Sequence, residues 1–191
     1  NVILALQGAR LEPLHYSPEQ VSPAFFKEIW QPSEIKEVID PDFGRTMIFV
    51  PDSVDENDSM KLFGDAIVVK RSGSYRKKSA KEYHINPSKP DDYKRLMGEV
   101  NEESGITVRE IAHLWSLDIP FPDTVDSNGF SLLKTLGLNS LLYLFQSFWD
   151  VVEVAPSRLL IVTSGAQHAP GIETVNPLQT SILGLGRVFL K

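Results

Sequence analysis

Tyrosine is the first residue type to test for chemistry in this sequence, because a tyrosine can protonate a carbonyl oxygen when a neighbouring base lowers its pKa. On a helix that base lies one turn later, four residues on. The tyrosines are Tyr16, Tyr75, Tyr83, Tyr93 and Tyr143. The residues four positions after them are, in order, Gln20, Ser79, Pro87, Met97 and Ser147. None is a lysine or an asparagine, so the spacing predicts no proton donor of this kind.

Ser164 directly follows an apolar run, Arg158–Thr163, and so takes the place at a strand end where catalytic serines often lie. Without an activated tyrosine it has nothing to assist. We interpret Ser164 as a strand-end hydroxyl that bonds to the backbone.

Glu110 and His113 have the Glu-x-x-His spacing of carboxylate metal sites, but such sites place the motif on a helix. Their segment, 108–115, is predicted to be a strand, which puts the two side chains on opposite faces. We expect His113 to lie in the core or at a strand end, and no metal site there. The other histidines, His15, His84 and His168, are scattered through predicted loops and form no recognisable set.

Nucleotide chemistry would require a glycine-rich turn after the first strand of an α/β sheet, where the backbone approaches a pyrophosphate. The turn that follows the short run Thr46–Val50 is PDSVDEND, residues 51–58, with four carboxylates and no glycine. One carboxylate about 5 Å from a phosphate charge costs roughly 3 kcal/mol at an effective dielectric constant near 20. The stretch Asp52–Asp58 also lacks the glycine of a calcium loop. Gly184 and Gly186 lie inside a predicted helix, so we predict no cofactor-binding residue.

A cluster of basic residues lies within twelve positions and could meet an acidic partner such as an acyl carrier protein. Its members are Lys70, Arg71, Arg76, Lys77, Lys78 and Lys81. The simpler interpretation is an exposed, mobile loop. Both interpretations stay open at this stage.

Composition limits the remaining classes of function. The 191 residues are typical of one domain, and 42% hydrophobic residues can form a sizeable core. The net charge of −6 gives no support to nucleic-acid binding. The absence of cysteine excludes disulfides, thiolate catalysis and cysteine-ligated zinc, and fits a reducing cytoplasm. The longest apolar stretch, 132–149, is too polar to span a membrane, and we expect a segment cut from a larger protein, without a signal peptide.

The elements that would position these residues alternate between strand and helix. Strands are predicted at 1–11, 24–30, 46–50, 66–70, 82–85, 108–115 and 158–163, with a linker at 13–23. Helices are predicted from 52 or 53 to 64, from Ser88 as N-cap to Gly105, over 131–151, and from Asn176 with Pro177 at the first position. The run RLLIVT is typical of a strand buried on both faces. The alternation predicts an α/β fold, a Rossmann-like, mainly parallel sheet flanked by helices.

Five segments carry a resemblance to a known family. They are Phe25–Pro32 (FFKEIWQP), Glu110–Leu117 (EIAHLWSL), Leu141–Phe148 (LLYLFQSF), Arg158–Gln167 (RLLIVTSGAQ) and Pro177–Val188 (PLQTSILGLGRV). In this order they resemble the structural ketoreductase subdomain of modular type I polyketide synthases, especially those served by trans-acting acyltransferases. Residues 1–11 are similar to the last strand of a dehydratase domain.

The resemblance implies a truncated, short-chain reductase-like subdomain over residues 24–191, preceded by an appendage over 1–23. It implies no catalytic, cofactor-binding or metal residue in this chain. NADPH and the catalytic groups would belong to a partner, the catalytic ketoreductase subdomain, on which this subdomain would pack. Other domains of the same antibiotic-producing multienzyme would be further partners, with no nucleic acid or membrane among them.

Three alternatives remain beside this prediction. The chain could be a pseudo-ketoreductase, whose halves are separated in sequence. It could be a stand-alone short-chain reductase with an unusual site, which NADPH binding by the chain alone would indicate. It could also be a docking module for a carrier protein, which the basic cluster would serve.

Overall fold

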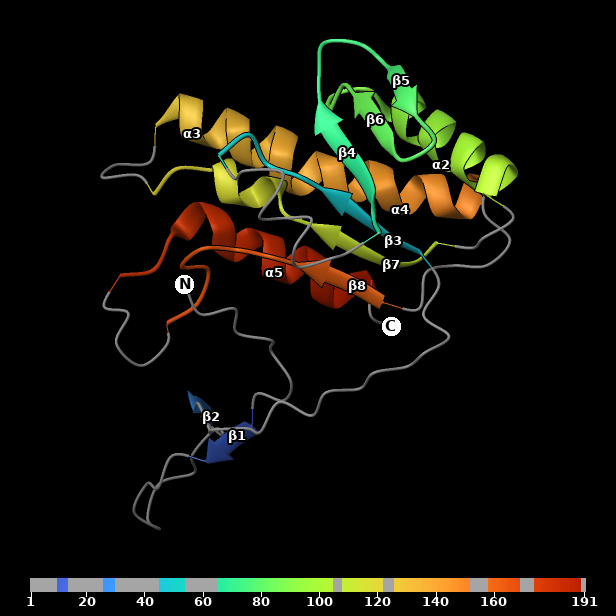
Figure 1. Cartoon of the computed structure of the whole chain (residues 1–191). Coiled ribbons are helices and arrows are strands. Elements are labelled where there is room, and N and C mark those ends of the chain that lie inside the picture. Colours follow the sequence, from blue (N-terminus) through green and yellow to red (C-terminus); the bar gives the residue numbers. More distant parts are fainter. Residues whose placement is uncertain are drawn as a thin grey trace, which may run out of the picture.

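The computed structural model describes residues 10–13, 26–29, 45–53, 65–104, 108–121, 126–151, 158–168 and 174–189. Two sheets are present among them. Strands β1 (Arg10–Pro13) and β2 (Phe26–Ile29) pair with each other in antiparallel fashion and form a sheet of their own. The other sheet has six strands and carries the helices (Figure 1).

The six-stranded sheet is mainly parallel, as predicted. Its strands are β3 (Arg45–Phe49), β4 (Ile67–Arg71), β5 (Arg76–Ser79), β6 (Glu82–Ile85), β7 (Val108–His113) and β8 (Arg158–Ile161). Their spatial order is β5-β6-β4-β3-β7-β8, with β5 antiparallel to β6 and every other neighbouring pair parallel. The carboxyl ends of the five parallel strands therefore meet at one edge of the sheet.

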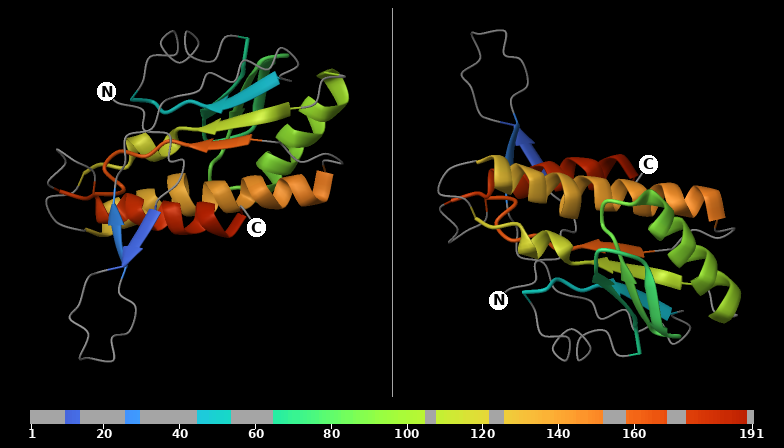
Figure 2. Two further views of the ribbon diagram at one scale, coloured as in Figure 1. Left: turned by 90° about the horizontal axis from the view of Figure 1, so that it is seen from below. Right: turned by 90° about the horizontal axis from the view of Figure 1, so that it is seen from above.

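Helices α2 (Pro90–Ser104), α4 (Ser140–Val151) and α5 (Pro177–Phe189) contribute to one core on one face of this sheet. Figure 2 shows α4 and α5 running side by side along the sheet. Successive strand residues point to opposite faces. Met47 and Phe49 enter the helix-covered core, whereas Ile48 belongs to a second buried cluster on the other face.

Two helix starts show how sequence signals fix the boundaries. Helix α5 begins at Pro177, and the Asn176 side chain accepts a hydrogen bond from the Leu178 N–H at 3.1 Å, as the predicted cap requires. Helix α2 begins at Pro90, so the position before it is Lys89 and the prediction of Ser88 as N-cap is wrong.

The long helix differs from its prediction in both start and regularity. It begins as α3 (Ser127–Leu132), capped by the Asp126 side chain, which accepts from the Gly129 N–H at 2.7 Å. A π-helical segment, η2 (Leu133–Asn139), then leads into α4. In η2, a Cβ on Gly137 would lie 2.8 Å from Ile182 Cδ1, so glycine permits the close approach of α5.

Three further predictions need correction. The basic segment is not a loop: residues 76–79 form the edge strand β5, which twists back on β6. Strand β8 is only half-buried because it is the other edge of the sheet. Strand β7 ends at His113, and the short 3₁₀ helix η1 (Trp115–Asp118) follows. The strand predicted over residues 1–9 and the helix over 54–64 lie outside the described residues. Within the described part, no helix is long and apolar enough to cross a bilayer.

His113 lies on β7 with its ring fully buried, and its Nε2 is 2.6 Å from Ser140 Oγ at the start of α4. Phe49 and Trp115 surround the ring, with centroids at 5.5 and 5.8 Å. Burial disfavours the imidazolium ion and lowers the pKa of His113 to about 3. The ring is therefore a neutral hydrogen-bonding group of the core.

This burial predicts a pH-dependent stability. In the unfolded chain the pKa of this histidine is about 6.5. The buried neutral ring therefore contributes fully to the free energy of unfolding above pH 6.5, and this contribution falls as the pH drops towards 3. Because of this group, we expect the free energy of unfolding to fall by about 1.4 kcal/mol for each pH unit below pH 6. Urea unfolding at several pH values should show the slope in the wild type and in Ser140→Ala, which leaves the ring buried. His113→Leu should lack it, and an unchanged slope in that variant would contradict the assignment.

Candidate functional site

The carboxyl edge of the parallel strands is where open α/β sheets bind their ligands, so it is the first place to examine. On this edge lie the turn after β3, the end of β4, the segment 114–121 after β7 and the segment 162–168 after β8. In this chain each of these segments is tied to another by hydrogen bonds or ion pairs.

The turn after β3 is held by a carboxylate from a distant segment. Asp118, at the end of η1, accepts the backbone N–H of Asp52 at 2.8 Å and that of Ser53 at 3.1 Å. A phosphate bound at such a turn would accept hydrogen bonds from backbone N–H groups in these positions. The Asp118 side chain has a relative accessibility of only 10%, so it stands largely out of water.

Arg71 completes this arrangement from the end of β4. Its guanidinium pairs with the Asp118 carboxylate and also contacts Asp52 Oδ2 at 2.5 Å. The Asp52 side chain is mostly exposed, at 72%, whereas Arg71 is at 16%. Asp118 is therefore the inner partner of Arg71 and Asp52 the outer one.

The described residues of this turn do not fit a dinucleotide. The donors that would bind a phosphate already have a carboxylate, and the sequence from 51 to 58 supplies no glycine. A phosphate at this point would meet the negative charges of Asp118 and Asp52 at close range.

The other half of the same edge is closed by the amino end of α5. The Gln179 amide accepts from the Ser164 N–H at 2.6 Å and donates to the Ile119 carbonyl oxygen at 3.1 Å. The Asn176 amide donates to the Pro120 carbonyl oxygen at 3.2 Å. Both side chains are almost completely buried. They join the segment after β8 to the segment after β7, in the space between two strand ends.

Phe121 adds an apolar contact at the same place. A Cβ on Gly165 would lie 3.2 Å from the Phe121 ring, and Gly165 has a φ of +70°, a conformation that favours glycine. The ring of Phe121 is otherwise half-exposed.

Among the described residues, Ser164 and the tyrosines do not gather at the strand ends, although Tyr93 and Tyr143 meet with ring centroids 5.8 Å apart. Ser164 is exposed at the end of β8, and its backbone N–H rather than its hydroxyl makes the bond to Gln179. Tyr93 lies deep in the core, donates to the Pro87 carbonyl oxygen at 3.2 Å, and has its pKa raised by burial. Burial also raises the pKa of Tyr75. A raised pKa is the opposite of what a tyrosine proton donor needs. Tyr16 and His15 lie outside the described residues.

Glu110 and His113 point to opposite faces of β7, as predicted. Glu110 accepts from Thr46 Oγ1 at 3.3 Å and pairs with Arg158 at 3.4 Å, across the neighbouring strands. His84 lies in β6 and not in a loop, with its Nε2 2.9 Å from Glu82. In the described part of the chain, no three acidic or histidine side chains gather in a way that could hold a metal ion.

Most of the predicted basic cluster is already engaged. Lys70 pairs with Glu82 at 3.3 Å, Lys81 pairs with Asp65, and the Lys77 ammonium lies 5.5 Å from the centre of the Tyr83 ring. Arg76, Lys78 and Lys81 are exposed, and within the described part of the chain Arg76 and Lys78 form no ion pair. Both lie on the edge strand β5, whose register against β6 is irregular between Lys77 and Ser79.

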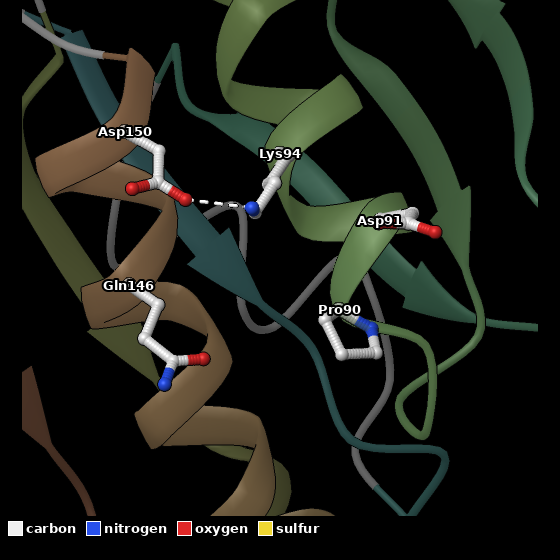
Figure 3. A pocket seen from close by; sticks show the side chains of 5 residues that line it. All are labelled: Pro90, Asp91, Lys94, Gln146 and Asp150. Atoms are coloured by element: carbon white, nitrogen blue, oxygen red, sulfur yellow. Dashed lines mark ion pairs between the residues drawn. The ribbon is translucent and has the colours of Figure 1, made fainter.

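A groove of about 370 Å³ lies between α2 and α4 (Figure 3). Pro90, Asp91, Lys94, Gln146 and Asp150 line it. Lys94 and Asp150 neutralise each other across it at 2.6 Å, and both are about half exposed. The groove therefore offers a paired, solvated surface with no reactive group.

Comparison with known proteins identifies the family. The family model described as "Beta-ketoacyl synthase-like, N-terminal" matches residues 44–181, well over half of the chain. The chain belongs to this family. No curated protein sequence matches the chain.

Solved structures similar to this member of the family contain reductase folds. A multidomain structure with adenylation, ketoreductase and pseudo Asub parts, from a keto acid-selecting NRPS module, has a TM-score of 0.70 at 21% identity over 82% of this chain. An N-terminal ketoreductase from the macrolactin assembly line has a TM-score of 0.54 at 18% identity over 68% of this chain. The chain covers only 13% and 27% of these two proteins. A short-chain dehydrogenase/reductase from Serratia marcescens reaches 0.50 at 11% identity, with 76% of this chain and 71% of that one covered.

At these identities the likeness establishes the fold alone. The predicted short-chain reductase-like, mainly parallel α/β fold is thereby confirmed. The family name refers to a synthase, yet the absence of cysteine leaves this chain without a thiolate nucleophile.

The sequence did not indicate Asp118 or Gln179 as residues of this edge. Asp118 stands between two apolar residues, in a stretch with no motif. The two N–H groups that donate to it are 66 and 65 positions away, and Arg71 is 47 positions away. Gln179 follows the Asn176 cap by three positions, which is typical of a capping box, but that signal predicts a local bond and not a bridge between two loops.

The unequal burial of the two partners of Arg71 predicts unequal effects of their removal. Asp118→Ala should lower the free energy of unfolding by about 3 kcal/mol, because it leaves a largely buried guanidinium and two N–H groups without their acceptor. Asp52→Ala should cost less than about 1 kcal/mol, since its carboxylate is mostly exposed. Urea unfolding of both variants measures the difference, and equal losses would refute the distinction.

Proposed function

We propose that this chain is a non-catalytic structural subdomain that packs on and stabilises an NADPH-binding catalytic ketoreductase subdomain. The two would form part of a module in a polyketide synthase or related assembly line. The observation that carries the proposal is the closed carboxyl edge of the sheet. Where a reductase would bind its cofactor and substrate, this chain places Asp118, Asn176 and Gln179.

The solved structures favour the same assignment. Two of them contain ketoreductases of larger assemblies. The small share of those proteins that the chain covers agrees with a subdomain that acts beside others. The trans-acyltransferase setting rests on the sequence resemblance alone, as does the choice between an active ketoreductase and a pseudo-ketoreductase.

A surface on α4 is suited to such a partner. Leu138, Leu142 and Phe145 are spaced as i, i+4 and i+7 and so form one stripe along the end of η2 and α4. Leu142 is exposed at 37%, and the other two are partly exposed. Apolar side chains in this position gain stability when a second helical surface covers them. We propose that the catalytic subdomain covers this stripe.

Binding to a catalytic ketoreductase subdomain of the same synthase tests the proposal. The mixture should unfold at a higher temperature than either part, with an interface above roughly 1,000 Å². Leu142→Glu should weaken association about tenfold or more, because it places a charge in the apolar contact.

Phe130→Glu is the matched control, since Phe130 is exposed at 58% on α3 and lies off the stripe. It should leave association unchanged. The absence of any stabilisation by the catalytic subdomain would remove the proposed role. Micromolar binding of NADPH to this chain alone would instead favour the stand-alone reductase.

A second candidate function is docking of an acidic carrier protein, which the exposed pair Arg76 and Lys78 on edge strand β5 favours. The double substitution of both residues by glutamine should weaken carrier-protein binding several-fold at low salt, where surface charges are poorly screened. Lys81→Gln is the control, because the Lys81 ammonium is already paired with Asp65. Binding that does not respond to loss of Arg76 and Lys78 would end this candidate.

A further inference from the structure

The turn after β3 keeps the donors of an anion site. In dinucleotide-binding sheets, N–H groups of this turn receive a phosphate, and an arginine about 20 residues further on accommodates a second one. Here the N–H groups of Asp52 and Ser53 point to one carboxylate, and Arg71 stands at the end of the next strand. Two backbone donors and one guanidinium therefore converge on a single negative group.

That negative group is the chain's own. The Asp118 carboxylate receives all three donors, one oxygen taking the Ser53 N–H and the other the Asp52 N–H and the guanidinium. A carboxylate is planar and a phosphate is tetrahedral, but both are oxyanions that accept charge-assisted hydrogen bonds of the same kind. A buried Nε of Arg71 without a hydrogen-bond partner shows that the guanidinium still has a donor to spare.

We propose that Asp118 is a built-in substitute for a phosphate, so that this turn is an oxyanion site occupied by the protein itself. The carboxylate keeps phosphate esters out, and it gives the turn and Arg71 the acceptor that a ligand would otherwise provide. This inference rests on the same closed edge as the proposed function, and it assigns the kind of group that Asp118 replaces there.

The charges of Arg71, Asp118 and Asp52 determine which variant should bind phosphate at this turn. In the wild type the single charge of Arg71 faces two carboxylates, which leaves the cluster negative. Asp118→Asn removes one of them while it keeps the size of the side chain. Asp52→Asn in addition removes the exposed carboxylate that would repel a phosphate. The double variant should thus leave the guanidinium without a carboxylate. The neutral amide at position 118 is a weaker acceptor for the two N–H groups than the carboxylate was, so a phosphate can displace it.

Titration with inorganic phosphate, against sodium chloride at the same ionic strength, tests the proposal. In the double variant the backbone amide resonances of residues 52 and 53 should shift, with an affinity about tenfold or more above that of the wild type. Phosphate should also raise its unfolding temperature by about 2–4 °C. Further replacement of Arg71 by glutamine should abolish both effects.

Two results would overturn the proposal. One is phosphate-dependent shifts of these amides in the wild-type chain, because the site would then not be closed. The other is that phosphate changes neither the amide resonances nor the unfolding temperature of the double variant. If the double variant does not fold, the same result for the single Asp118→Asn variant would count. The first result would also count against the closed edge that carries the proposed function. Binding of the catalytic subdomain is measured separately, at α4, so failure of the two proposals can be told apart.

Discussion

The ion pair between Arg71 and Asp118 is the interaction on which the carboxyl edge of the sheet depends. It joins the end of β4 to the segment after β7 and, through the N–H groups of Asp52 and Ser53, to the turn after β3. Three strands are thus connected at their ends by one carboxylate. A pair so far withdrawn from water is useful only while both partners remain, because either one alone would be a poorly solvated charge. The same contact that orders the edge also occupies the N–H donors of the turn after β3.

Much of the fold could be predicted from the sequence because its signals are local. Runs of β-branched and apolar residues marked β3, β4, β6 and β7, and the Asn176–Pro177 pair marked the start of α5. The lack of glycine after β3 correctly directed attention to that turn. The sequence did not predict strand β5, because RKKS has no apolar alternation. Its backbone pairing with β6, rather than its side chains, makes this segment a strand.

The remaining features depend on contacts that a local pattern does not carry. The partners of Asp118 and Gln179 become visible only when the strands are ordered side by side. The half-buried state of β8 follows from its place at the end of the sheet, which an apolar run cannot reveal. The π-helical segment follows from the packing of one helix on another. In each case a tertiary constraint decides between conformations that the sequence allows equally well.

Gly137 links this packing to the carboxyl edge. Its missing side chain lets α5 lie against η2 at Ile182, which is six residues after Asn176 and less than one turn after Gln179. Because α5 is a continuous helix, its position at Ile182 determines how deeply its first turn reaches between the strand ends. The contact between Gly137 and Ile182 thus helps to hold Asn176 and Gln179 between the ends of β7 and β8. A larger side chain at position 137 would push α5 away from η2 and draw its first turn out of that space.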